Sequence, residues 1–489
     1  MTRYWMLIVV ALVAMQAARA DDAVTRLARL LADKGLISRE ELAAVQRSGP
    51  EEAVALLTDL LARKGLLTAS EVAAVVQRSP GGAGDVRFVP VVAANATPAP
   101  APVQAPRSTG AETAGAVTTA SKSPLQFYGT ILWNAFGNTA GTNVEDIPLV
   151  ASKNGSDPYQ NFGMTARQSR FGLRFQGPDV FGAKMSGTME MDFFGGKTPL
   201  TNGVNMDIFR LRLAYGRLDW HNVSIEAGQD WAVFSPLNPT SLASFAIPSM
   251  SASGNPWIRS PQFRFESRAE HLLFQAAVLD PNIGDNPTTV VDARTPGIGE
   301  RGGAPAVESR LAAVGKIGDR DVSVGFSGHY NRGLNVGTIG SQTATRGVDS
   351  WGVNLDYTLP FHRRFGLTGE AFVGRALGLF SVASGEAVLP PGTPGEHGVL
   401  ARGGWMQAQI NLNPRWQINA AYGIEAMDPA NLRVGDRAKN QTYMANLMRK
   451  LNQRITLSWE WRRILTDYRN QQTANAIIDL ANMGIAYTF

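Results

Sequence analysis

The sequence contains no cysteine among its 489 residues. This absence excludes a disulfide framework, a thiolate metal site and a cysteine nucleophile, and it is compatible with an oxidising envelope compartment. Beyond the N-terminus no apolar run reaches the roughly 20 residues that a bilayer-crossing helix needs, so helical membrane spans are excluded. The net charge of +5, from 46 basic and 41 acidic residues, is too small to indicate nucleic acid as a partner.

The N-terminus of the sequence has the pattern of an export signal. Arg3 precedes the apolar core YWMLIVVALVAM, and the following AARA carries small residues, Ala18 and Ala20, that suit signal peptidase. We predict a signal peptide at residues 1–20, cleaved before Asp21. A membrane anchor is the alternative, but the apolar core is short for a span.

Residues 21–79 contain a duplicated segment. LARLLADKGLISREELAAVQRS and LTDLLARKGLLTASEVAAVVQRS align with an offset of 30 residues, and leucines at helical spacing stop at a glycine in each copy. Ser38 with Glu41, and Thr68 with Glu71, form capping boxes at the start of a following helix. We predict two helix-turn-helix units in the periplasm. They either pack on other subunits or an envelope partner, or form a self-contained small domain.

Residues 80–124 are rich in Ala, Pro, Thr and Gly and have scarcely an aromatic residue. Such a composition cannot offset the conformational entropy that folding removes. The PAPAPVQAP core should be stiff and extended. We predict a disordered linker that separates the helical module from the rest of the chain.

From residue 125 to residue 489 the sequence alternates with a two-residue period, as in AKMSGTMEMDF, and this period is typical of strands with two different faces. Most of these segments have about the 9–11 residues that a tilted membrane strand needs. Connections after even-numbered segments are short and most of the others are long, as in outer-membrane barrels with periplasmic turns and outer loops. The predicted strands are 125–136, 167–177, 183–194, 207–218, 223–232, 261–268, 271–280, 307–316, 321–331, 349–359, 365–376, 399–412, 416–425, 440–450, 455–466 and 475–489.

We therefore predict an all-β fold: a 16-stranded antiparallel transmembrane β-barrel in the outer membrane. In DIFRLRLAYG the apolar face holds Phe209, Leu211, Leu213 and Tyr215, opposite Arg210 and Arg212. A charged face needs a wet lumen, because ionised groups in a dry sandwich would each need a partner. A soluble β-protein would also alternate, but sixteen strands without covering helices would leave edges and apolar surface exposed.

The last segment, ANMGIAYTF, alternates and ends on an aromatic residue. This ending resembles the signal that delivers bacterial outer-membrane barrels to their insertion machinery. We therefore assign Tyr487 and Phe489 to an insertion signal, with that machinery and membrane lipid as partners.

A candidate constriction loop, loop 3, follows the fifth strand at residues 232–261. It is apolar and has no acidic residue, so we expect it to fold into the lumen and narrow it, with burial at a subunit interface as the alternative. Its predicted constriction residues are Phe234, Leu237, Phe245, Trp257 and Arg259.

Charged residues alternate along the predicted inner wall. The basic positions are Arg170, Arg174, Arg210, Arg212 and Arg264, and the acidic positions between them are Glu190, Asp192, Glu226 and Asp230. Strands lie about 4.8 Å apart, so these charges could pair and brace the wall. Alternatively, guanidiniums left partly free would lower the barrier for anions such as carboxylates or phosphates. The opposite wall is predicted to be neutral or acidic, with Asp356, Glu370, Glu425 and Glu460 facing inward.

Two long stretches, RQSRFGLRFQGPDVFGAKMSGTMEMDFFGG and RLRLAYGRLDWHNVSIEAGQDWAVFSPLNP, resemble trimeric porins of the DcaP type and, more distantly, phosphate-selective porins. The resemblance implies a homotrimer that takes up small dicarboxylate-like anions. It matches Arg170, Arg174, Arg210 and Arg212 to the family's basic wall, and GQDW to the motif before its constriction loop. A duplicated helix hairpin stands where that family has a coiled coil.

We expect a porin that lets small hydrophilic solutes diffuse passively and that favours anions such as dicarboxylates or phosphate. The alternative is a structural anchor that links the barrel to the cell wall through the N-terminal helices. Of the five histidines, only His329, beside Ser327, lies at an inward strand position, and we interpret this pair as lumen polarity. We therefore predict no enzymatic activity, no metal and no cofactor.

Overall fold

The computed structural model describes residues 37–48, 116–118, 124–153, 158–196, 207–281, 296–377, 387–470 and 476–489, together with a few single positions between residues 28 and 60. The chain divides into two compact units, Met1–Pro98 and Ala99–Phe489. The predicted signal peptide, most of the duplicated segment and most of the linker lie outside the described residues.

In the first unit the helix α3 (Arg39–Arg47) begins at the predicted capping box. The Glu41 amide donates to Ser38 Oγ at 3.1 Å, and the Ser38 amide donates to Glu41 Oε2 at 2.6 Å. The capping box at Ser38 is confirmed, whereas the one at Thr68 lies outside the described residues. None of the helices within the described ranges is long and apolar enough to cross a membrane.

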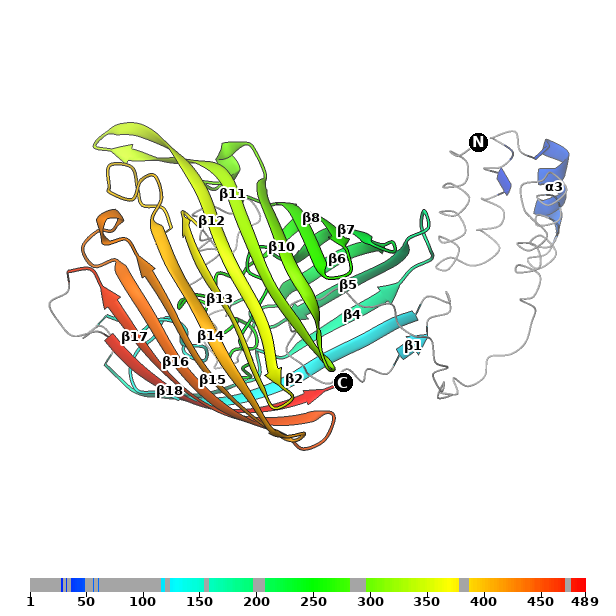
Figure 1. Ribbon diagram of the computed structural model, residues 1–489. Helices are drawn as coiled ribbons and strands as arrows, with labels where there is room; N and C mark the ends of the chain where they lie inside the picture. The colour runs from blue at the N-terminus through cyan, green and yellow to red at the C-terminus, as the bar shows by residue number, and fades with distance from the viewer. Residues whose placement is uncertain are drawn as a thin grey trace, which may run out of the picture. The chain divides into compact units, whose positions relative to one another are not determined.

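The second unit is a closed antiparallel barrel of sixteen strands, as predicted (Figure 1). The second strand is split into two pieces, β3 and β4, which both pair with β2, and the barrel closes where the last strand, β18, pairs with β2. The strands are β2 (Pro124–Asn138), β3 (Asn161–Thr165), β4 (Arg170–Gln176), β5 (Lys184–Asp192), β6 (Arg210–Asp219), β7 (Val223–Trp231), β8 (Arg259–Arg268), β9 (Leu272–Leu279), β10 (Ala306–Ile317), β11 (Arg320–Ile339), β12 (Gln342–His362), β13 (Phe365–Arg375), β14 (Leu400–Asn413), β15 (Trp416–Met427), β16 (Arg437–Lys450), β17 (Ile455–Tyr468) and β18 (Ala476–Thr488).

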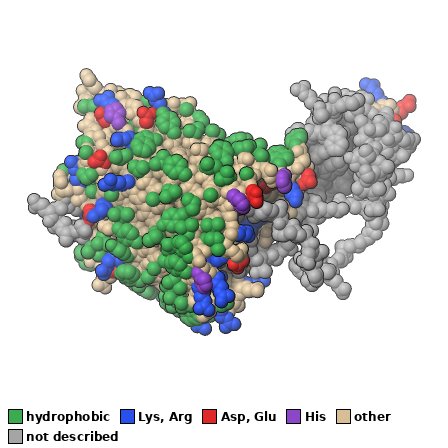
Figure 2. All heavy atoms as spheres, in the orientation of Figure 1, with side chains coloured by type: hydrophobic (Ala, Val, Ile, Leu, Met, Phe, Trp, Pro, Cys, Tyr) green, Lys and Arg blue, Asp and Glu red, His purple; other side chains and the backbone are tan. Residues whose placement is uncertain are grey.

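Alternate side chains along the strands form an apolar outer surface. On β17 and β18, Trp459, Trp461, Ile485 and Tyr487 are exposed, while Ser458 and Glu460, which alternate with the two tryptophans, are buried. Figure 2 shows hydrophobic side chains spread over the strands and charged ones gathered mainly toward the margins of this face. Such a surface fits lipid outside and a polar interior.

The C-terminal residue, Phe489, bonds to β2 of the barrel. The Phe489 amide donates to the Gly129 carbonyl, and the Gly129 amide donates to the Phe489 carbonyl, both at 3.0 Å. The Phe489 ring packs against Phe127 with the ring centroids 5.4 Å apart. A short additional strand, β1 (Ala116–Thr118), pairs with the start of β2, inside the range predicted to be a disordered linker.

One predicted face is wrong because β6 carries a β-bulge. Glu190 of β5 pairs with Leu213, whereas the next residue, Met191, pairs with Leu211, so Arg212 is an extra residue. Beyond the bulge the alternation is reversed. Leu213 and Tyr215 are therefore 4% and 9% exposed inside the barrel and do not share the outer face of Leu211.

The β11–β12 hairpin is longer than predicted. It runs to Ile339 and back from Gln342, where we expected a loop between residues 331 and 349. Asn335 and Val348 on its inner side are buried, because the loop residues 387–399 pack there and the Asn335 amide donates to the Leu389 carbonyl. This packing lets the two strands continue past the neighbouring strand ends.

Candidate functional site

Loop 3 spans residues 232–258, since β8 begins at Arg259, and nearly all of its residues are buried. The Val233 and Phe234 amides donate to Glu308 of β10 at 2.9 and 3.0 Å. Further along, the loop reaches Glu370 of β13, Glu460 of β17 and Asn134 of β2. Because these strands lie around a closed barrel, a segment that contacts all of them lies inside it.

Glycines on the inner wall make room for loop 3. A Cβ atom on Gly423 would lie 2.2 Å from the Ser253 carbonyl oxygen and 2.9 Å from the Met250 sulfur. A Cβ atom on Gly352 would lie 2.8 Å from the Phe234 ring. The loop backbone therefore contacts the wall at Gly423, and the Phe234 ring contacts it at Gly352. A side chain at either position would prevent this contact.

A second inward segment was missed by the sequence analysis. Residues 139–153 follow β2 and place Ile147 and Leu149 against Ile247 and Trp257 of loop 3. The Leu149 carbonyl accepts from Asn440 Nδ2 of β16 at 2.8 Å. The run IPLVA was the available signal, since an apolar run in a long loop needs burial.

The predicted basic and acidic residues of β4, β5 and β6 come together beside loop 3. Arg210 donates to Asp192 at 3.0 and 2.6 Å, and Arg212 bonds Glu190 at 2.7 Å and Asp192 at 2.8 Å. Arg170 pairs with Glu190 at 3.5 Å. These cross-strand pairs hold the wall together, and each of the three guanidiniums also donates to a loop 3 carbonyl group.

Two further arginines belong to this region. Arg167, which the sequence analysis did not single out, lies in the break between β3 and β4 and donates from Nε to Asp146 at 2.7 Å. Arg259 places its guanidinium 4.9 Å from the Trp231 ring centroid and 5.0 Å from that of Trp257. Among the described residues, buried Nη1 of Arg259 has no hydrogen-bond partner. The guanidiniums of Arg167, Arg170, Arg210, Arg212 and Arg259 are called the arginine cluster below.

The remaining predicted wall residues form other contacts. Arg174 lies over the Tyr128 ring, 4.3 Å from its centroid. Arg264 lies 3.2 Å from Asp230 and 3.6 Å from Glu226, in a buried network that also contains Arg217 and Glu266. This network holds two arginines and three carboxylates, and its cross-strand pairs brace β6, β7 and β8.

The four carboxylates predicted on the opposite wall are buried, and each has a partner. Asp356 pairs with Arg310 at 2.6 Å, Glu425 lies 3.6 Å from Arg437, and Glu460 pairs with Arg462. Glu370 accepts from the Leu237 amide of loop 3 at 2.8 Å. The sequence analysis did not single out these arginines. Arg462 lies on the same strand as Glu460, Arg437 lies on the strand next to that of Glu425, and Arg310 lies two strands away from Asp356.

The geometry gives no support for catalysis within the described residues. His329 contacts Glu308 at 3.2 Å and Ser350 at 3.3 Å, while Ser327 Oγ donates to the Phe234 carbonyl at 2.6 Å. Both side chains are therefore engaged in holding strands and loop 3. In the same ranges, no group of three His, Asp or Glu side chains is placed to hold a metal ion.

Solved structures with this architecture are outer-membrane channels. The chain resembles the outer membrane channel DcaP of Acinetobacter baumannii with a TM-score of 0.59 and 17% identity, covering 77% of this chain and 100% of that one. The anion-selective porin of Comamonas acidovorans (0.48, 13%, covering 75% and 100%) and OprB of Pseudomonas putida (0.47, 9%, covering 75% and 94%) are more distant. No family model and no curated protein matches. The fold is that of an outer-membrane porin barrel.

Proposed function

We propose that the protein is an outer-membrane porin through which small hydrophilic solutes diffuse passively, with a preference for small anions such as dicarboxylates or phosphate. One observation carries the proposal: five guanidiniums gather beside loop 3 and only three carboxylates bond them. The guanidiniums are the arginine cluster, and the carboxylates are Asp146, Glu190 and Asp192.

Carboxylates of the opposite wall do not offset the effect of this excess positive charge on a passing ion. Carboxylates there are held by arginines or by loop 3 amides, so they present little free negative charge to a passing ion. Arg210 keeps a quarter of its side chain exposed. A guanidinium that stays partly solvated in a narrow passage lowers the free energy of an anion and raises that of a cation.

Loop 3 sets the width of the passage in this proposal. Its contacts with β2, β10, β13 and β17 support a position across the lumen, where it would leave only a narrow path beside the arginine cluster. A barrel of sixteen strands is otherwise wider than its side chains can fill.

Reversal potentials in a salt gradient test the anion preference. Replacing Arg210 by Gln removes one unit charge about 6 Å from the path, or about 0.7 kcal/mol in water. Because the cation gains what the anion loses, the anion-to-cation permeability ratio should fall about tenfold. Arg259→Gln should act in the same direction. Arg463→Gln is the matched control, since Arg463 is exposed and pairs with Asp479 at 2.8 Å.

An unchanged ratio in folded Arg210→Gln and Arg259→Gln proteins would contradict the anion preference. A channel with no current in any salt would contradict the porin itself. A homotrimer is part of the proposal, supported by contacting aromatic rings: Phe171 on β4, Phe193 just after β5 and Phe209 just before β6. The mass of the detergent-solubilised protein, corrected for bound detergent, tests it.

A further inference from the structure

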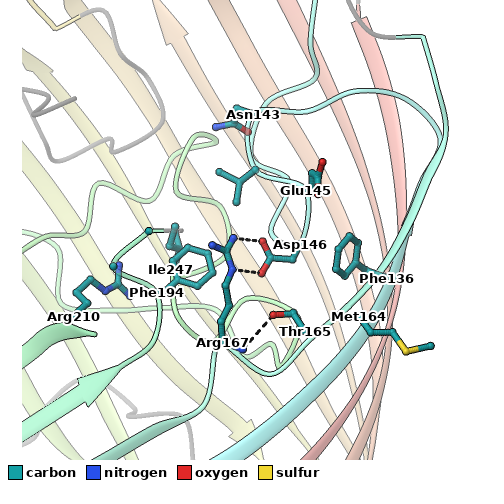
Figure 3. Close-up of a pocket in the computed structure, with 13 residues that line it drawn as sticks. Phe136, Asn143, Glu145, Asp146, Met164, Thr165, Arg167, Phe194, Arg210 and Ile247 are labelled. Atoms are coloured by element: carbon teal, nitrogen blue, oxygen red, sulfur yellow. Dashed lines mark hydrogen bonds and ion pairs between the residues drawn. The ribbon is translucent and has the colours of Figure 1, made fainter. Parts of the chain in front are cut away.

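A cavity of about 590 Å³ lies in the lumen between loop 3, the segment after β2 and the barrel wall (Figure 3). We call it the outer pocket and define it by Phe136, Asp146, Arg167, Phe194, Arg210 and Ile247, which are among its lining residues. It lies at the end of the arginine cluster, and none of the interactions described so far fills it.

On the polar side of the outer pocket, the guanidiniums of Arg167 and Arg210 lie on either side of the Phe194 ring. The Arg167 guanidinium lies 3.9 Å from the Phe194 ring centroid and the Arg210 guanidinium 5.4 Å from it. Figure 3 shows Phe194 between the two arginines, with Asp146 on the far side of Arg167. Both arginines bond their carboxylates through Nε and Nη2, and Nη1 of each has no acceptor among the described residues.

Another part of the pocket lining is apolar. Phe136 and Ile247 are both nearly fully buried, and together with Phe194 they form walls that could cover a hydrocarbon body. Nη1 hydrogens that have no acceptor among the described residues, next to apolar walls, suit one carboxylate joined to an apolar group.

The acidic groups of the pocket disfavour a second negative charge on the ligand. Asp146 is buried beside Arg167, and the carboxylate of Glu145 is exposed at the rim of the same cavity. A dicarboxylate that engages the arginines would bring its second carboxylate toward these groups or onto the aromatic walls, and both placements cost free energy.

We propose that the outer pocket binds a small monocarboxylate with an aromatic or branched aliphatic body. Its carboxylate accepts from Nη1 of Arg210 or Arg167, and its apolar body packs on Phe194, Phe136 and Ile247. This inference rests on the proposed porin function and names a preference within its anions. No bond is made or broken, and the site delays one class of solute on its way through the barrel.

Calorimetric titration of the full-length protein in detergent tests the proposal, with benzoate, acetate, succinate and benzyl alcohol as probes. Benzoate should bind at least about tenfold more tightly than acetate, because only its ring buries apolar area. It should also bind more tightly than succinate, which brings a second charge, and than benzyl alcohol, which brings none.

Phe194→Ala should weaken benzoate binding about tenfold, since it removes the ring between the arginines and keeps both charges. Phe193→Ala is the matched control, because the ring of Phe193 packs against Phe209, 4.5 Å between centroids, and does not line the pocket. Benzoate binding that is unchanged in Phe194→Ala, or equalled by acetate or succinate in the wild type, would overturn the proposal.

The two proposals fail in different ways. Calorimetry reads the pocket without any ion flow, so benzoate binding by a silent barrel would refute the porin and leave the pocket standing. An anion-selective current with no benzoate binding would refute the pocket alone. The wild-type probe series gives this answer even if Phe194→Ala does not fold.

Discussion

Gly423 offers a direct way to move loop 3 without changing any charge. The residue lies on β15, and the three nearest atoms to a Cβ atom there all belong to loop 3: the Ser253 carbonyl oxygen, and the Met250 sulfur and Cβ. We predict that Gly423→Ala displaces the tip of loop 3 and widens the passage.

The size of the effect follows from the distances. The added carbon would lie 2.2 Å from the Ser253 oxygen. The loop must retreat by about 1.2 Å or more to reach an ordinary van der Waals separation. Overpacking of this kind costs about 1–3 kcal/mol. The retreat also strains the hydrogen bonds of Ser253 Oγ with Thr442 Oγ1 at 2.7 Å and Asn440 Nδ2 at 2.9 Å. The tip of loop 3 therefore loses its contacts with the wall, while the strands of the barrel stay paired.

Single-channel conductance in planar bilayers is the assay. Gly423→Ala should conduct more than the wild type, with the mobility shift between unheated and boiled samples showing that the barrel is folded. Gly216→Ala on β6 is the control, because a Cβ atom there has no neighbour within 4 Å. If folded Gly423→Ala conducted like the wild type, loop 3 would not be the element that sets the passage.

Three further predictions concern stability, assembly and pH. Asp192→Asn breaks a buried bridge to two arginines, so the free energy of unfolding measured in urea should fall by about 3 kcal/mol or more, while the anion preference rises. Deleting Phe489 removes both hydrogen bonds to Gly129 and should lower the amount of folded barrel in outer-membrane fractions. Glu396, outside the strands, keeps its pKa below the ordinary value because the Gly392 amide donates to it at 2.7 Å. This bond contributes fully above the ordinary pKa of Glu and is lost as pH falls through the lowered pKa, so exchange of the Gly392 amide should accelerate there.

The strands could be predicted because each side chain of a barrel wall faces either lipid or the lumen. Apolar and polar residues therefore alternate in the sequence with a period of two. The bulge at Arg212 could not be predicted in this way. One extra residue moves the following side chains to the other face of the sheet and leaves the composition of the segment unchanged. Leu213 and Tyr215 were therefore assigned to the wrong side.

The charged residues of the wall were found, but their partners were not all foreseen. Arg170, Arg210 and Arg212 meet carboxylates on the adjacent β5, which the order of strands makes predictable. Arg167 lies in a break within one strand, and its partner Asp146 comes from a long loop. No local pattern reports such a contact, because it depends on how a loop folds back across the whole barrel.

The contacts of loop 3 also set an order of events in assembly. Val233 bonds a residue 75 positions later in the chain, and Ser241 bonds one 219 positions later. Neither contact can form until strands from the second half of the polypeptide have joined the sheet. The partners are far apart in the sequence, and these strands bring them close to loop 3. Loop 3 therefore reaches its final position late in assembly. Under the proposed function, an intermediate that lacks its closing strands would conduct ions without the anion preference.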